Sequence, residues 1–147
     1  LDPVGINGAA LQMFSHGVMT ALMFSMVGVV YDQAHTRELA AFGGLASKVP
    51  RVSVFFVIAG LTSVVLPGFS GFIAEFNIFV GLFATYPVLG GFAILGAGIT
   101  TVYIFRMLAL SFFGTFNEDR WGGLRDMNRF ELVGGGLLIV VGIELFA

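Results

Sequence analysis

Two ionisable side chains lie in the middle of long apolar stretches of this sequence. His16 belongs to an apolar stretch that continues to about residue 31, and Glu75 belongs to a second that ends near residue 86. An ionisable group at membrane depth is costly and is usually there for function. Histidine changes charge near neutral pH, and a carboxylate can bind and release a proton. Both residues are therefore candidates for proton transfer.

Each candidate also has a structural interpretation. His16 can be a neutral imidazole bonded to a neighbouring helix, and Glu75 can be a hydrogen-bond partner between helices. Arg106, near the end of a third apolar stretch, is expected to extend its guanidinium to the membrane surface. Glu144 stands too close to the end of the sequence to be assigned a role.

The stretch that contains Glu75 cannot be one straight helix. Its 35 residues, 52–86, would extend about 50 Å, whereas the hydrocarbon core is about 30 Å thick. Pro67, Gly68 and Gly71 lie near its middle, where proline removes a backbone donor and glycine permits non-helical dihedrals. We predict one crossing made of two half-helices broken at residues 67–71, with a simple proline kink as the alternative.

Glu75 follows the predicted break by about one helical turn. Free N–H groups at the start of the second half-helix favour a charged carboxylate, whereas an apolar surrounding opposes it. Opposed influences of this kind are typical of a side chain that exchanges protons.

Composition predicts that the bilayer is the solvent of this chain. Hydrophobic residues make up 57% and charged residues 11% of the 147, against about 25% charged in soluble domains. The mean hydropathy is +0.96. We predict an all-α membrane protein, a polytopic bundle of transmembrane helices of which one is broken. The expected helices cover residues 6–31, 52–86, 88–113 and 132–147, and both ends of the sequence look like cuts within a longer chain.

The basic residues predict an orientation. If the broken stretch crosses once, the polar segments 32–51 and 117–131 fall on the same side of the membrane. Six basic residues then lie there: Arg37, Lys48, Arg51, Arg120, Arg125 and Arg129. The positive-inside rule places this side in the cytoplasm.

Several kinds of site are not expected. The chain has no cysteine, which removes thiolate iron–sulfur ligation and disulfides. The basic residues form no patch for nucleic acid, so that partner is excluded. Gly90, Gly91, Gly96 and Gly98 follow no strand, and helix packing explains them better than a dinucleotide loop does. We expect neither a metal nor a cofactor in this chain.

Several motifs of the sequence resemble a known family. They occur in the order and spacing of chain 4, or subunit M, of NADH:quinone oxidoreductase (respiratory complex I), across nearly the whole chain. The motifs are Gln12-Met13-Phe14-Ser15-His16-Gly17, Tyr31-Asp32-Gln33-Ala34-His35-Thr36-Arg37, Gly43-Gly44-Leu45, Leu66-Pro67-Gly68-Phe69-Ser70-Gly71-Phe72-Ile73-Ala74-Glu75-Phe76, Phe112-Phe113-Gly114 and Asp126-Met127-Asn128-Arg129-Phe130-Glu131.

The resemblance implies an antiporter-like subunit of fourteen helices, of which this chain holds the eleventh to the fourteenth. In that family the twelfth helix is discontinuous and its acidic residue ends a line of buried charges, a position that Glu75 matches. His16 matches the histidine of the preceding helix. Sister subunits usually carry lysine where Glu75 stands, which favours chain 4. Ala109 and Leu110 replace arginines common in the family before the Phe-Phe-Gly motif.

The function that the resemblance implies is proton translocation, driven by quinone reduction elsewhere in a complex. NADH, FMN, iron–sulfur clusters and quinone are then expected in partner subunits, and the partners of this chain are neighbouring membrane subunits, lipid and protons. A bacterial plasma membrane or an equivalent energy-transducing membrane is the expected location. The alternatives are a subunit of a Mrp-type cation/proton antiporter or of a membrane-bound hydrogenase, and, from another class, a structural membrane scaffold.

Overall fold

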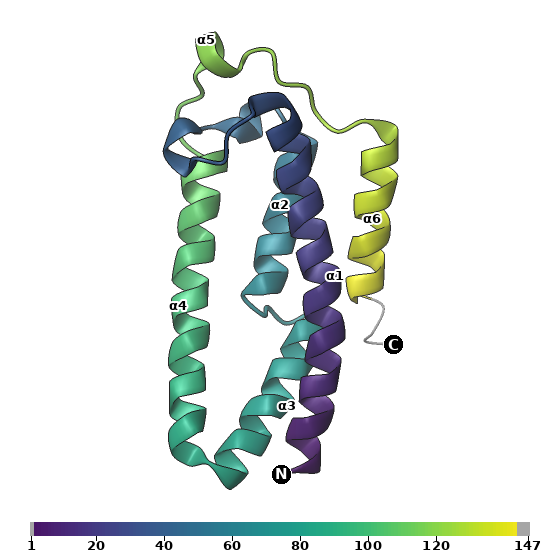
Figure 1. Ribbon diagram of the computed structural model, residues 1–147, viewed down its shortest axis with the longest axis vertical. Helices are drawn as coiled ribbons and strands as arrows, with labels where there is room; N and C mark the ends of the chain where they lie inside the picture. Colours follow the sequence, from purple (N-terminus) through teal and green to yellow (C-terminus); the bar gives the residue numbers. More distant parts are fainter. Residues whose placement is uncertain (1, 144–147) are drawn as a thin grey trace.

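The chain folds as an elongated bundle of helices (Figure 1). The computed structural model describes residues 2–143, and no strand occurs among them, so the predicted all-α architecture is confirmed. In chain order the elements are α1 (Pro3–Ala34), the 3-10 helices η1 (Leu39–Ala41) and η2 (Leu45–Ser47), α2 (Pro50–Ser63), α3 (Ser70–Thr85), α4 (Pro87–Phe112), α5 (Glu118–Trp121) and α6 (Arg129–Ile143).

The long helices α1 and α4 run along the whole bundle (Figure 1). They have 32 and 26 residues, and within residues 2–143 they alone are both long and apolar enough to cross a bilayer unaided. α1 starts at Pro3, before the expected residue 6, because Asp2 accepts a hydrogen bond from the N–H of Gly5 at 3.0 Å and Pro3 begins the helix. A capped start with proline in the first position is a strong signal for the beginning of a helix.

α2 and α3 together make one crossing. α2 has 14 residues and α3 has 16, which gives lengths of about 21 and 24 Å, each below the ~30 Å hydrocarbon core. Figure 1 shows α2 descending from the loop end and α3 continuing to the opposite end, where the chain turns into α4. The helix predicted at residues 52–86 is therefore discontinuous, and both polar segments lie at the same end of the bundle.

The break lies at residues 64–69, earlier than the predicted 67–71. Val65 adopts a left-handed conformation with φ 59°. Its N–H donates to the carbonyl of Thr62 at 3.1 Å, and that of Leu66 donates to the carbonyl of Leu61 at 3.4 Å. These two bonds form a Schellman motif, which ends α2 before Pro67 is reached. The prediction for Gly71 was wrong, because Gly71 lies in the first turn of α3.

Small residues bring the backbones of α1 and α3 together. A Cβ atom on Gly8 would lie 2.7 Å from the carbonyl oxygen of Ala74, and one on Gly81 would lie 2.6 Å from the Cα of Gly5. Glycine is therefore required at both positions for this close approach, as in many helix pairs within membranes. The contact holds α3, and Glu75 on it, directly against α1.

The two polar segments pack against each other at the loop end. The side chain of Gln33 accepts from the N–H of Arg125 at 2.6 Å and donates to its carbonyl at 2.9 Å. Trp121 Nε1 donates to the carbonyl of Ala41 at 2.9 Å. These bonds join residues about 80 to 90 positions apart, so they fix one polar segment on the other.

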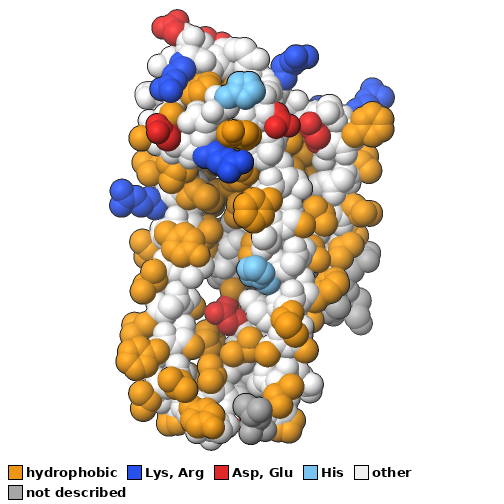
Figure 2. Space-filling view, in the orientation of Figure 1, with side chains coloured by type: hydrophobic (Ala, Val, Ile, Leu, Met, Phe, Trp, Pro, Cys, Tyr) orange, Lys and Arg blue, Asp and Glu red, His pale blue; other side chains and the backbone are white. Residues whose placement is uncertain are grey.

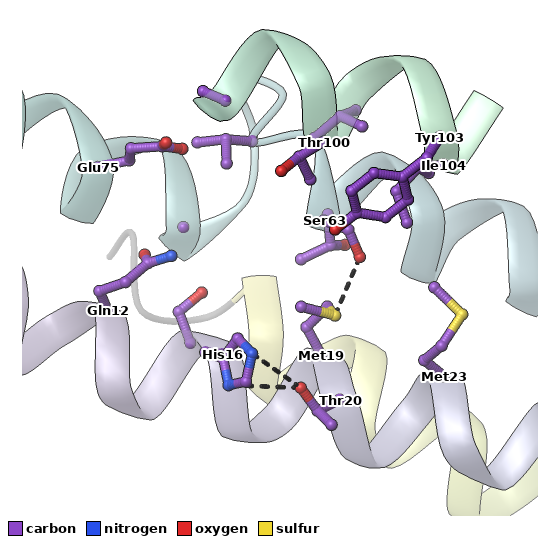
Figure 3. Close-up of a pocket in the computed structure, with 16 residues that line it drawn as sticks. Gln12, His16, Met19, Thr20, Met23, Ser63, Glu75, Thr100, Tyr103 and Ile104 are labelled. Atoms are coloured by element: carbon purple, nitrogen blue, oxygen red, sulfur yellow. Dashed lines mark hydrogen bonds between the residues drawn. The ribbon is translucent and has the colours of Figure 1, made fainter. Parts of the chain in front are cut away.

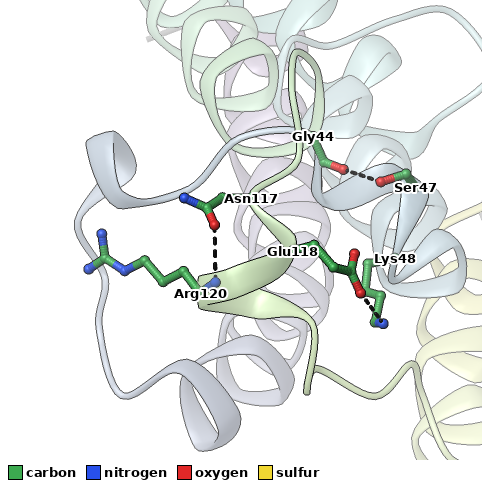
Figure 4. Close-up of polar contacts among 6 residues, drawn as sticks. All are labelled: Gly44, Ser47, Lys48, Asn117, Glu118 and Arg120. Atoms are coloured by element: carbon green, nitrogen blue, oxygen red, sulfur yellow. Dashed lines mark hydrogen bonds and ion pairs between the residues drawn. The ribbon is translucent and has the colours of Figure 1, made fainter.

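Figure 4 shows a second set of contacts at the same end. Lys48 Nζ lies 3.2 Å from Glu118 Oε1, and Asn117 caps α5 by accepting from the N–H of Arg120 at 3.0 Å. Gly44 has φ 62°, and a Cβ there would lie 2.6 Å from the N of Phe116. Gly44 is therefore needed both for its conformation and for the close passage of the second segment.

α6 begins at Arg129, three residues before the expected start. Asn128 and Glu131 form a reciprocal capping box, in which each backbone N–H donates to the other side chain, at 2.7 and 2.9 Å. This arrangement fixes the start of a helix. The end predicted for this helix, with Glu144, lies outside the described residues.

Candidate functional site

A cavity of about 410 Å³ lies where α1, the break between α2 and α3, and α4 meet (Figure 3). Its walls carry many polar side chains for a bundle whose surface is otherwise largely apolar (Figure 2). These side chains are Gln12, Ser15, His16, Thr20, Thr62, Ser63, Glu75, Thr100 and Tyr103. A polar hollow of this size in a membrane helix bundle has room for water and for side chains that exchange protons.

The structure brings His16 and Glu75 to this one cavity. They are 59 positions apart in the sequence and come from different helices, α1 and α3. His16 is exposed, and its ring nitrogen Nδ1 lies 3.4 Å from Thr20 Oγ1. Glu75 is partly buried, and among residues 2–143 it has no ion-pair partner. Glu75 therefore presents to the cavity a carboxyl group that no described residue neutralises.

A buried hydrogen bond fixes the start of α3 next to the cavity. Ser70 Oγ donates to Ser15 Oγ at 2.9 Å, and both side chains are buried. A Cβ on Gly71 would lie 3.2 Å from Ser15 Oγ, so the backbone of α3 fits closely against this bond. Because Ser15 precedes His16 and Ser70 stands five residues before Glu75, the bond sets the position of one candidate relative to the other.

The break contributes to the cavity through residues that the sequence does not single out. Val64 and Val65 line it, together with Thr62 and Ser63 at the end of α2. Pro67 and Gly68 are exposed and are not part of its lining. They turn the chain between the two half-helices, with Gly68 at φ 111°. Gly71, placed in the break by the sequence, instead forms part of the cavity wall.

Helix α4 supplies a third wall that sequence reasoning missed. Thr100 and Tyr103 are three residues apart and project from one face of α4 towards the cavity (Figure 3). The signal was present, since two hydroxyl residues at helical spacing in an apolar helix mark a polar stripe. Arg106, one turn further along, is exposed on α4 and does not line the cavity.

Comparison with known proteins supports the resemblance seen in the motifs. Residues 3–101 match the family described as NADH:quinone oxidoreductase/Mrp antiporter, transmembrane. Subunit M of NADH-quinone oxidoreductase from Rickettsia felis is 37% identical over 137 residues, covering 93% of this chain and 28% of that protein. NAD(P)H-quinone oxidoreductase chain 4 from Gloeobacter violaceus is 40% identical, covering 80% of this chain and 24% of the relative. This chain thus spans about a quarter of the length of these relatives.

Two solved structures share the fold. A chain of the membrane-bound sulfane sulfur reductase, an archaeal respiratory membrane complex, superposes with a TM-score of 0.89 at 26% identity, covering 97% of this chain and 24% of that one. A chain of respiratory complex I from Thermus thermophilus gives a TM-score of 0.74 at 26% identity, covering 96% and 32%. The prediction of a membrane protein of this type is confirmed, and the chain belongs to the NADH:quinone oxidoreductase/Mrp antiporter transmembrane family.

Proposed function

We propose that this chain is part of a proton-translocating membrane subunit of an NAD(P)H:quinone oxidoreductase. One observation carries the proposal: a single polar cavity at a helix break is lined by both His16 and Glu75. Discontinuous helices with ionisable groups beside the break recur at the ion sites of transporters. The similarity to subunit M and chain 4 supports the setting, since those relatives are named as subunits of quinone oxidoreductases.

The mechanism assigns a role to each candidate. Glu75 binds and releases the transported proton, because its carboxyl group faces the cavity and has no ion-pair partner among residues 2–143. His16 relays the proton along α1, since an imidazole can accept a proton on one nitrogen and donate from the other. Quinone reduction in other subunits supplies the free energy by rearranging buried charges. No redox centre is needed in this chain.

The similarity to the archaeal sulfane sulfur reductase chain favours a second candidate function, that of a Mrp-type antiporter or hydrogenase subunit. The sulfane sulfur reductase chain fits with a higher TM-score, 0.89, than the complex I chain, 0.74. A Mrp-type antiporter or a hydrogenase subunit would use the same cavity with a different energy source. The scaffold alternative differs in kind, because it requires that neutral substitutes for Glu75 and His16 leave transport unchanged.

The test is substitution of Glu75 in the full-length protein assembled in its complex. Glu75→Gln keeps the size of the side chain and removes its titration, so we expect the complex to assemble normally. Proton translocation should fall about a hundredfold or more. Quinone reduction should be uncoupled from translocation or slowed. Glu75→Asp should keep part of the translocation, because the acid persists. His16→Gln should have a smaller effect, since water can bridge a missing relay.

Asn77 provides a matched control on the same helix. It lies two residues from Glu75 and does not line the cavity. Asn77→Ala keeps the Cβ that faces Gly8 of α1 and should leave proton translocation unchanged. Normal translocation in Glu75→Gln, with loss only in variants that alter bulk, would assign Glu75 a structural role and favour the scaffold.

A further inference from the structure

A row of exposed side chains runs along α4 on the side that faces away from its contacts with α2 and α3. The large apolar members of this row, which we call the α4 seam, expose 58% to 72% of their surface: Val88, Phe92, Leu95, Ile99, Val102 and Phe113. Arg106 and Ala109, also exposed, complete the row. Ile104 and Leu108, which pack against Gly60 of α2, lie on the opposite side of the helix. Residues 2–143 therefore leave the α4 seam uncovered.

The spacing of the α4 seam is that of a helix–helix interface. Along its whole length, successive members are alternately four and three residues apart. This alternation places side chains on the line of contact of a left-handed helix pair, the commonest kind in membrane bundles. Gly91 and Gly98 stand one turn before Leu95 and Val102, and a Cβ on either glycine would meet nothing within 4 Å. Small residues beside the seam let a second backbone come close, whereas lipid chains require neither this spacing nor the glycines.

Arg106 is the only charged residue of α4, and it belongs to the α4 seam. Among residues 2–143 it has no ion-pair partner. It stands six residues before Phe112, the last residue of α4, which is about 9 Å from the end of a helix that is about 39 Å long. In a hydrocarbon core about 30 Å thick, its Cα lies about 5 Å below the surface when the helix is centred. A single polar residue in an apolar seam selects the partner that compensates it, and for a guanidinium that partner is a carboxylate.

From these observations we propose that the α4 seam is a docking surface for a transmembrane helix of a neighbouring subunit, and that this helix carries an Asp or Glu opposite Arg106. The docking surface rests on the part of the proposed function that places the chain in a membrane complex. That setting is supported by relatives named as subunits and by a similar chain in a respiratory membrane complex. The docking surface requires no proton transfer at Glu75.

Photo-crosslinking in the assembled full-length complex identifies what covers the α4 seam. A photoreactive amino acid replaces Ile99 in the seam, and Ile94, exposed on another side of α4, is the matched control position. At Ile99 we expect an adduct with one peptide of another subunit, identified by mass spectrometry. That peptide should contain an acidic residue within a membrane-spanning segment, and the Ile94 position should not capture it. An adduct at Ile99 with lipid, or with the protein's own chain, would overturn the proposal.

Reversal of the charge at Arg106 tests the ion pair. Arg106→Glu places like charges opposite each other and should lower the yield of the Ile99 adduct about tenfold or more. Changing the acidic residue of the captured peptide to Arg should restore the yield, and Arg106→Lys should keep part of it. The control Arg125→Glu, at an exposed position of the polar segment, should leave the yield unchanged.

An unaltered yield in Arg106→Glu, or a loss that the reciprocal change does not restore, would refute the ion pair. If Arg106→Glu prevents assembly, assembly becomes the readout, and the reciprocal change should restore it. Glu75→Gln separates this inference from proton transfer. An Ile99 adduct with another subunit, together with normal translocation in Glu75→Gln, would uphold the docking surface and contradict the proposed proton transfer. Lost translocation in Glu75→Gln without such an adduct would overturn the docking surface alone.

Discussion

Val65 lies in the break, just after α2, and its conformation ends that half of the broken helix. It is β-branched and adopts φ 59°, a conformation that usually belongs to glycine at the end of a helix. Such strain costs about 1 to 3 kcal/mol and tends to persist where function requires it. Here the strained conformation of Val65 ends α2 at a point where the last two residues of that helix, Thr62 and Ser63, line the cavity.

This strain leads to a prediction about stability. Val65→Gly removes the strain but adds about 0.5–1 kcal/mol of backbone entropy cost, so we expect the free energy of unfolding to stay level or rise by about 1 kcal/mol. The neighbouring Val64, at φ −92°, is the matched control. Val64→Gly gains no relief and should destabilise by about 0.5–1 kcal/mol.

Thermal unfolding of the purified full-length protein compares the two variants. A Val65→Gly protein less stable than the Val64→Gly protein would show that the left-handed conformation is not strained in its setting. The proton translocation rate of the Val65→Gly protein should be measured as well. A lower rate, caused by a more flexible break, would link the strain at Val65 to function.

At the level of residues, the sequence was informative where an ionisable side chain interrupts an apolar stretch. His16 and Glu75 are ionisable groups in apolar stretches, and the structure places both on one cavity. Their role in proton transfer stays a prediction. The role of Val65 was not predictable, because valine normally avoids positive φ and the tertiary packing that imposes this conformation leaves no local signal. For the same reason the break was assigned to Pro67–Gly71 and not to residues 64–69.

The start of α2 depends on a residue more than seventy positions away. α2 has no cap from its own preceding residue, Val49. Instead, the carboxylate of Asp126 accepts from the N–H of Arg51 at 3.0 Å and from that of Val52 at 3.1 Å. A carboxylate at the N-terminus of a helix satisfies its free donors and interacts favourably with the helix dipole.

Removing this distant cap should destabilise the first half of the broken helix. For Asp126→Ala we expect a loss of about 1–2 kcal/mol in the free energy of unfolding, and for Asp126→Asn a smaller loss, since the amide oxygen still accepts. Asp119→Ala, at an exposed position in the first turn of α5, is the control and should be nearly neutral.

Hydrogen exchange locates the effect. Amides at the beginning of α2 should exchange faster in Asp126→Ala than in the unaltered protein, whereas those of α4 should not change. Equal exchange at Arg51 and Val52 in both proteins would mean that water replaces the carboxylate at no cost.

The elements themselves were largely predictable, since apolar runs long enough to cross a membrane allow few alternatives to helices. Their ends were not. The cap of α2 comes from a distant loop, and the short helix α5 lies in a segment that was expected to be only polar. Contacts between segments far apart in the sequence decide such features, and no local pattern records them.

For the whole molecule, the arrangement of charge predicts an orientation. Both polar segments pack at one end of the bundle, and Figure 2 shows Lys and Arg side chains gathered towards that end. Under the positive-inside rule this end faces the cytoplasm. Cysteines introduced singly at Arg37 and Arg125, which are exposed, should react with an impermeant reagent only from the cytoplasmic side. Labelling of either position from outside would contradict the orientation.

Infrared difference spectroscopy on the full complex tests most directly whether Glu75 gains and loses a proton during turnover. Spectra recorded at rest and during turnover report changes in the protonation of carboxyl groups. We expect a carbonyl band that appears or disappears with turnover in the unaltered protein, shifts in Glu75→Asp and is missing in Glu75→Gln. A difference spectrum that keeps every carboxyl band in Glu75→Gln would show that Glu75 holds the same protonation state throughout, and would contradict the proposed function.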